Sequence, residues 1–109
     1  MDDAREEDTM RRVLVRYKVT ADRAAENEAF ICAVFRELAQ AAPTDVRYCS
    51  LKLEDGVSFV HIMEAEGGGG SLTELPAFKA FTAKIRDRCE EPPAATEFSP
   101  VGAYRVFTV

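Results

Sequence analysis

The sequence predicts an α+β domain in which two helices cover one face of a four-stranded antiparallel sheet. Three observations favour this fold. First, apolar residues recur every second residue in some segments, as in strands, and every third or fourth residue in others, as in helices. Second, an Asp-Gly pair joins two segments in which apolar and polar residues alternate. Third, the order strand–helix–strand occurs twice. The length of 109 residues suits a single domain, and a composition of 47% hydrophobic and 30% charged residues is ordinary for a globular chain.

The first eleven residues are acidic and have no apolar rhythm, so we expect a disordered leader over residues 1–11 and one folded domain over residues 12–109. A strand follows at residues 13–19, where Val13, Val15, Tyr17 and Val19 alternate with other residues.

An amphipathic helix is predicted next, with Thr20 or Asp22 as its N-cap and its end near Pro43. Its apolar stripe also includes one amide, which should be buried with a hydrogen-bond partner. The stripe consists of Asn27, Ile31, Val34, Leu38 and Ala41.

Two further strands, at residues 46–53 and 57–64, flank Asp55-Gly56, a strong signal for a hairpin. Residues 67–70 are four glycines and predict a mobile loop that could close over a pocket.

A second helix is expected from about Pro76 to the stop at Pro92-Pro93, followed by a last strand over residues 103–109. Its stripe consists of Leu75, Phe78, Phe81, Ile85 and Cys89. The resulting order, βαββαβ, is a ferredoxin-like topology.

Charge and composition exclude several classes of function. Fourteen basic against nineteen acidic residues give a net charge of -5, which argues against a nucleic-acid partner. No apolar run approaches the roughly 20 residues that a membrane span requires. Three widely spaced cysteines and a single histidine favour a reduced, cytoplasmic protein with neither a metal site nor a cofactor. Cys32 and Cys89 lie on faces of the predicted helices, and we expect both to be small core residues.

The second face of the predicted sheet is partly apolar, because both parities of the strands carry apolar side chains. In the third strand Phe59 and Met63 lie on one face, whereas Val60 and Ile62 lie on the other. Such a face usually finds a partner, so we expect a homodimer that packs sheet against sheet and buries about 800 Å² per chain.

These segments resemble the dimeric α+β barrel superfamily, in its antibiotic-biosynthesis-monooxygenase-like branch, over residues 12–109. The resemblance is carried by the opening strand Val13–Val19 before a long helix, by Glu54-Asp55-Gly56 and by the stretch from Leu75 to Phe81. It implies a barrel of two sheets with a cavity for a small ligand in each chain. Members include cofactor-independent monooxygenases, haem-degrading enzymes, isomerases and stress-induced proteins.

The chain departs from the functional residues that this resemblance implies. The monooxygenase and haem-degrading branches use an asparagine on the first strand and a tryptophan at the pocket. This sequence has no tryptophan, and its single asparagine, Asn27, lies in the first predicted helix. None of the family's functional residues is therefore carried over.

His61 is the candidate catalytic residue, because an imidazole can act as a general base near neutral pH. The alternative is a buried histidine that is hydrogen-bonded to a neighbour. Candidate ligand-binding residues are Tyr17, Tyr48, Tyr104 and Arg16. The tyrosines could equally pack with satisfied hydroxyls, and Arg16 or Lys18 could pair with Glu64 or Glu54.

The sequence thus predicts a homodimer that binds a small apolar or aromatic molecule. An enzymatic form would oxygenate an activated ring without a cofactor, or move a proton on it, with His61 as base and a tyrosine as hydrogen-bond donor. The alternative is a non-catalytic structural or stress-associated dimer whose pocket is filled by its own side chains.

Overall fold

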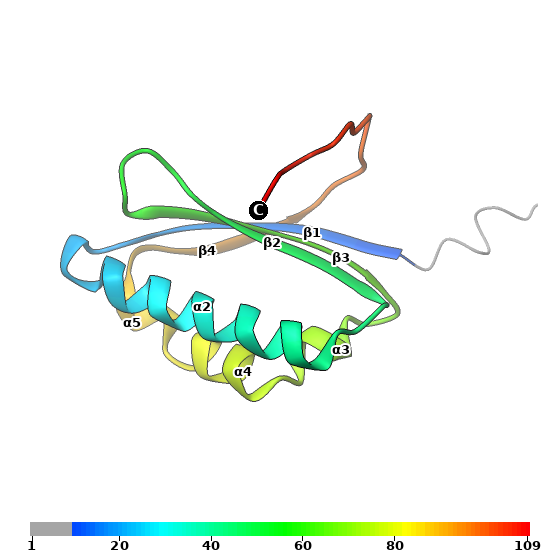
Figure 1. Cartoon of the computed structure of the whole chain (residues 1–109). Helices are drawn as coiled ribbons and strands as arrows, with labels where there is room; N and C mark the ends of the chain where they lie inside the picture. Colours follow the sequence, from blue (N-terminus) through cyan, green and yellow to red (C-terminus); the bar gives the residue numbers. More distant parts are fainter. Residues whose placement is uncertain (1–9) are drawn as a thin grey trace, which may run out of the picture.

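A computed structural model describes residues 10–109 and has one sheet with all of its helices on a single face (Figure 1). The elements follow in the order β1 (Met10–Val19), η1 (Ala21–Arg23), α2 (Ala24–Ala41), β2 (Val46–Lys52), β3 (Ser58–Glu66), α3 (Gly70–Thr73), α4 (Pro76–Ala83), α5 (Ile85–Arg88) and β4 (Cys89–Glu97).

The strands lie in the order β2-β3-β1-β4, and each neighbouring pair is antiparallel. This arrangement confirms the predicted α+β, ferredoxin-like fold. Of the predicted leader, residues 1–9 lie outside the described residues. The last two residues of the predicted leader, Met10 and Arg11, pair with β3, so the first strand begins before Val13.

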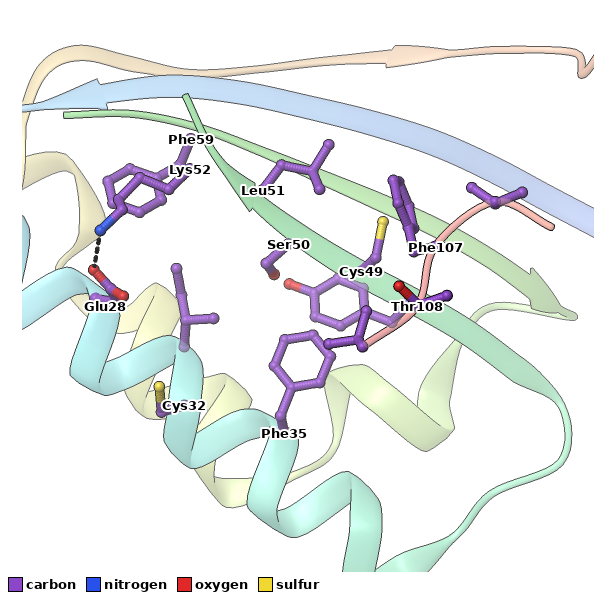
Figure 2. A pocket seen from close by; sticks show the side chains of 14 residues that line it. Glu28, Cys32, Phe35, Cys49, Ser50, Leu51, Lys52, Phe59, Phe107 and Thr108 are labelled. Carbon is purple, nitrogen blue, oxygen red and sulfur yellow. Dashed lines mark hydrogen bonds and ion pairs between the residues drawn. The ribbon is translucent and has the colours of Figure 1, made fainter. Parts of the chain in front are cut away.

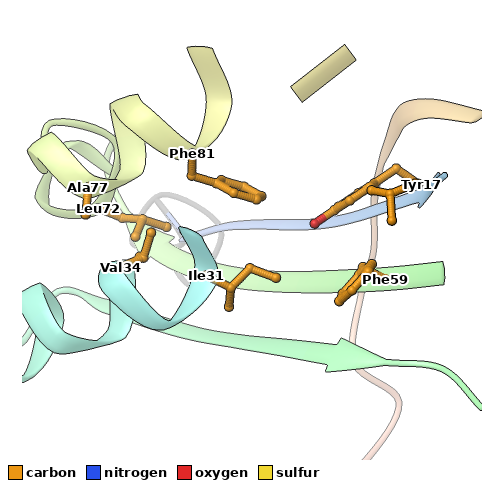
Figure 3. Packing of buried hydrophobic residues seen from close by; sticks show 8 residues of the cluster. Tyr17, Ile31, Val34, Phe59, Leu72, Ala77 and Phe81 are labelled. Carbon is orange, nitrogen blue, oxygen red and sulfur yellow. The ribbon is translucent and has the colours of Figure 1, made fainter. Parts of the chain in front are cut away.

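The core lies between the sheet and the helices, as Figure 3 shows. One parity of β1 and β3 points into it, and α2, α3 and α4 cover it. Its buried residues are Tyr17, Val19, Ile31, Val34, Phe59, Leu72, Ala77 and Phe81. The opposite parity of the same strands forms the second face of the sheet, as the alternation predicted.

The predicted hairpin joins β2 to β3 and is held by the Asp55 side chain. Asp55 Oδ1 accepts hydrogen bonds from the backbone N–H groups of Val57, at 3.0 Å, and Ser58, at 2.8 Å. Gly56 has a φ of 77°, which a glycine adopts without strain. The hydrogen bonds of Asp55 and the positive φ of Gly56 explain why an Asp-Gly pair is a reliable sequence signal for this turn.

The second predicted helix is divided into shorter pieces. After α4 the backbone leaves helical geometry at Lys84, whose φ is -133°, and α5 ends at Arg88. The predicted helix extended to Pro92 and is wrong beyond Arg88. The predicted apolar stripe ended at Cys89, which the structure assigns to the start of β4.

The predicted last strand over residues 103–109 is also wrong, because β4 is formed by Cys89–Glu97. β4 lies at the edge of the sheet, and its register with β1 shifts between Arg16 and Lys18. Pro92 and Pro93 fall at this irregularity. An edge strand with a bulge tolerates prolines, which have no N–H to donate to a ladder.

Residues 98–109 form no helix or strand and leave the sheet on the side away from the helices (Figure 1). We call this segment the C-terminal arm. Among the described residues, all the large hydrophobic side chains classed as exposed belong to it. They are Val101, Tyr104, Val106, Phe107 and Val109.

Candidate ligand-binding site

A cavity of about 250 Å³ lies between the inner face of the sheet and the helices α3 and α4. Its wall is almost entirely apolar. The side chains that line it include Val15, Tyr17, Tyr48, His61, Phe78 and Phe81. Three of the residues predicted for a site, Tyr17, Tyr48 and His61, therefore meet at one cavity.

Strand register brings these residues together. His61 lies directly opposite Val15 on β1 and Ser50 on β2. Tyr17 pairs with Phe59, and Tyr48 pairs with Met63, so each tyrosine is a diagonal neighbour of His61. All lie on the inner parity of the sheet, where diagonal neighbours with large rings come into contact.

His61 is buried and lies between the two tyrosines. Its ring stacks on Tyr17 with centroids 5.3 Å apart and on Tyr48 with centroids 5.9 Å apart. The Tyr17 hydroxyl lies 2.7 Å from His61 Nε2. On the other side, His61 Nδ1 lies 2.7 Å from Ser50 Oγ and 2.9 Å from the Tyr48 hydroxyl. Both ring nitrogens therefore have hydrogen-bond partners.

The polar contacts continue from Tyr17 into the helices. Asn27, fully buried on α2, donates from Nδ2 to the Tyr17 hydroxyl at 2.8 Å. Arg88 donates from Nε to Asn27 Oδ1 at 3.1 Å. The buried amide predicted on this helix is thus confirmed, together with its side-chain partner.

Arg88 is a buried cation at the junction of α5 and β4. It donates from Nη2 to the Phe81 carbonyl at 2.7 Å, which satisfies an acceptor in the last turn of α4. Its guanidinium carbon lies 4.5 Å from the centroid of the Phe30 ring and 5.5 Å from that of Phe81. Contact with ring faces and with the end of a helix stabilises a positive charge that burial disfavours.

Burial determines the protonation of the site. It lowers the pKa of His61 from 6.5 to about 4, so the imidazole is neutral at physiological pH. Desolvation raises the pKa of Tyr17 and raises that of Tyr48 to about 12. Both phenols therefore keep their protons, and the site holds no negative charge of its own.

The structure does not bring Arg16 or Tyr104 to this cavity. Arg16 is exposed on the other parity of β1, next to Tyr17 in sequence, and Tyr104 is 84% exposed on the C-terminal arm. Lys18 pairs with Glu90 at 3.8 Å rather than with Glu54 or Glu64. Glu64 instead pairs with Arg12 at 2.7 Å and with Arg47 at 3.4 Å.

Two polar members of the site, Arg88 and Ser50, were not found from the sequence. Arg88 lies seven residues after Phe81, a spacing that places it on the apolar stripe of the predicted helix. A charge on such a stripe was the available signal. Ser50 lies two residues after Tyr48, on the same face of β2, but a single serine in a strand gives no signal of a site.

The glycine segment borders the site. Gly69, with a φ of 79°, precedes α3, and Leu72 of that short helix lines the cavity. Cys32, in contrast, is exposed, so its prediction as a core residue is wrong, and Cys89 lies at the start of β4.

A second, larger groove of about 750 Å³ lies between α2, β2 and the end of the C-terminal arm (Figure 2). Phe35 of α2 and Phe107 of the arm line it, and the ion pair between Lys52 and Glu28, at 3.0 Å, lies at one end. The groove shares Tyr48 and Ser50 with the site around His61. Tyr48 therefore lies between this groove and the cavity beside His61.

Within residues 10–109, no three histidine, cysteine or acidic side chains are arranged to hold a metal ion. In the same part of the chain, no helix is long and apolar enough to cross a membrane.

The depressed pKa of His61 predicts how stability depends on pH. Between pH 6.5 and about 4 the unfolded chain binds a proton at His61 that the native chain does not, so stability falls as pH falls. Unfolding by urea should show a loss of roughly 2 kcal/mol between pH 7.5 and 5. The variant His61→Gln should lack this loss, and equal pH dependence in the two proteins would contradict the assignment.

Comparison with known proteins supports the fold. No protein-family model matches the chain, and a search of curated proteins also finds no match. Solved structures do match. A putative antibiotic biosynthesis monooxygenase from Nitrosomonas europaea is 14% identical, with a TM-score of 0.69, over 85% of this chain and 91% of that one.

Two further structures agree. Rv0793 from Mycobacterium tuberculosis is 18% identical, with a TM-score of 0.69, over 86% of this chain and 97% of that one. A variant of SnoaB, a cofactor-independent oxygenase from Streptomyces nogalater, is 18% identical, with a TM-score of 0.61, over 87% of this chain and 96% of that one. The chain therefore has the α+β fold of these structures, which include a putative antibiotic biosynthesis monooxygenase, in agreement with the sequence resemblance.

Proposed function

We propose that this protein binds a small apolar or aromatic molecule in the cavity beside His61. The observation that carries the proposal is an apolar cavity of about 250 Å³ whose polar lining is gathered around one histidine. A dry cavity of about 150 Å³ accepts benzene. The larger volume here suits a molecule with one ring or two fused rings.

The alternative, a structural dimer with a filled pocket, requires side chains to occupy this space. Phe78 and Phe81 line the cavity and leave it open. An unfilled apolar cavity lowers stability, because its lining lacks van der Waals partners. A cavity kept open at this cost supports a role in ligand binding.

An enzymatic form of the proposal is cofactor-independent oxygenation of the bound ring, with molecular oxygen as the second reactant. The similarity to SnoaB in fold supports it. In this form neutral His61 receives the proton of the ring through the Tyr17 hydroxyl, which lies 2.7 Å from His61 Nε2, and a tyrosine hydroxyl donates a hydrogen bond to a ring oxygen. Deprotonation of the ring would make it electron-rich and so able to react with oxygen. One oxygen atom of O2 then bonds to the ring and the other leaves as water, which takes up the two hydrogens that the ring loses, so a phenol would become a quinone.

Ligand binding can be tested with naphthalene and 1-naphthol by calorimetry or fluorescence. Val15→Phe places a ring in the cavity and should weaken binding at least about ten-fold, because the space is then occupied. Ala83→Phe adds the same ring at an exposed position outside the cavity and should bind like the wild type. Equal affinity in both variants would show that these probes bind elsewhere.

Catalysis can be tested by oxygen uptake with 1-naphthol. If His61 is the base, His61→Gln, which keeps a polar side chain at this buried position, should reduce turnover about 100-fold or more in a protein that remains folded. Lys79→Ala, on the exposed surface of α4, is the control for the assay. Unchanged uptake in folded His61→Gln would exclude His61 as the base.

We also propose that the protein is a homodimer that packs through the second face of its sheet. Two cross-strand rows on this face carry apolar side chains. One is formed by Leu14, Ile62 and Cys49, and the other pairs Val60 and Leu51 with Arg16 at its β1 end. The neighbouring row, Arg12–Glu64–Arg47, is a network of ion pairs. An apolar centre beside a charged border is the usual anatomy of an interface.

The C-terminal arm supports the same proposal. It leaves the sheet on the side away from the helices, and five of its large hydrophobic residues are more than half exposed (Figure 1). Exposed apolar area of this extent in a twelve-residue segment favours a partner surface. A second copy of the chain offers one in the apolar rows of its own sheet.

The assembly can be measured by sedimentation velocity between 1 and 100 µM. Ile62→Glu places a charge at the centre of the apolar rows and should raise the dimer dissociation constant about 100-fold or more, since an unpaired charge would be buried. Lys79→Glu, on the helical side, should not change it. A wild-type chain that remains monomeric at 100 µM would contradict the proposal.

The compartment and remaining partners follow from charge and thiols. The three cysteines are unpaired, which supports our proposal of a reducing, cytoplasmic environment. A net charge of -5 supports the absence of a nucleic-acid partner.

A further inference from the structure

The polar side chains around His61 form one continuous chain of hydrogen bonds from Arg88 to Ser50. We infer that the Arg88–Asn27 pair sets the direction of this chain and holds His61 in the tautomer that is protonated on Nδ1. Asn27 and Arg88 are then positioning residues. The inference concerns the same cavity as the proposed function, but it is tested without ligand, so the two can fail separately.

The direction begins at Arg88, because a guanidinium can only donate hydrogen bonds. Its Nε lies 3.1 Å from the side-chain amide of Asn27, so the atom that faces it must be the acceptor, Oδ1. The other end of the same amide, Nδ2, must therefore face the Tyr17 hydroxyl at 2.8 Å. Arg88 thus determines the orientation of the Asn27 amide.

Tyr17 transmits this direction to His61. Its oxygen accepts the bond from Asn27, and its single proton remains to be donated. Among the described residues, the other hydrogen-bond partner of this hydroxyl is His61 Nε2, at 2.7 Å. A proton on Nε2 would leave the Tyr17 proton buried without an acceptor, which is costly. His61 Nε2 is therefore the bare, accepting nitrogen.

The single proton of neutral His61 then lies on Nδ1. Two hydroxyl oxygens are close enough to accept it, Ser50 Oγ at 2.7 Å and the Tyr48 hydroxyl at 2.9 Å. Neither hydroxyl needs to donate back to the imidazole. The chain of donors therefore runs from Arg88 through Asn27, Tyr17 and His61 toward the strand β2.

The tautomer can be read directly, because His61 is the only histidine of the chain. Long-range ¹H–¹⁵N NMR spectra of the ligand-free, ¹⁵N-labelled protein at pH 8.5 distinguish the two ring nitrogens. We expect the Nδ1-protonated form to dominate by roughly ten to one or better. A wild-type protein with its proton on Nε2 would overturn the inference.

The variant Asn27→Asp should reverse the direction of the hydrogen bonds between residue 27, Tyr17 and His61, with almost no change in the shape of the side chain. A carboxylate can only accept, so Tyr17 must donate to it and present a lone pair to His61 Nε2. The dominant tautomer should switch to the Nε2-protonated form. Ser50→Ala is the control and should keep the proton on Nδ1, since Tyr48 remains as its acceptor. An unchanged tautomer in a folded Asn27→Asp protein would contradict the inference.

If Asn27→Asp does not fold, Tyr17→Phe provides an independent test. This variant removes the hydroxyl that donates to His61 Nε2 and leaves both partners of Nδ1, so the proton should stay on Nδ1 while the ¹⁵N signal of Nε2 moves to that of a nitrogen without a hydrogen bond. An Nε2 signal that does not move would mean that Tyr17 does not donate to it, and the inference would be wrong.

Discussion

The buried guanidinium of Arg88 is the constraint on which the interior of this protein depends. A cation inside an apolar core is stable only where donors and charge are satisfied. Arg88 meets this requirement with the carbonyl of Phe81, the amide of Asn27 and the faces of two phenylalanine rings. In doing so it joins the end of α4 and the start of β4 to Asn27 of α2, which lies 61 positions away in the sequence.

The same contacts explain how an apolar cavity can border a polar site. Each polar atom around His61 has its partner within the protein, so few polar atoms remain for the cavity wall. The inner face of the sheet therefore combines an ordered hydrogen-bond chain with space for an apolar molecule. The opposite face has a different composition, in which ion pairs border apolar rows, so the proposed ligand site and the proposed dimer contact lie on opposite faces of the sheet.

Most elements could be predicted because their signals are local. The alternation in β1, the stripe of α2 and the Asp55 turn each depend on residues within one element, and the structure confirms all three. The errors occur near Pro92 and Pro93. They were read as the end of the second helix, but they lie within β4, where their tolerance depends on an edge position and a bulge opposite β1.

By itself, the sequence determined the order of strands and helices, the alternation within the strands and the burial of Asn27, because periodicity encodes which residues of an element share a side. It also supplied His61, Tyr17 and Tyr48 as candidates, and the structure brings them together at one cavity. Only the tertiary structure decided that Arg88 and Ser50 join them and that Arg16 and Tyr104 do not. The physical reason is that a hydrogen bond between residues 61 positions apart depends on where packed elements end, and no local pattern records that position.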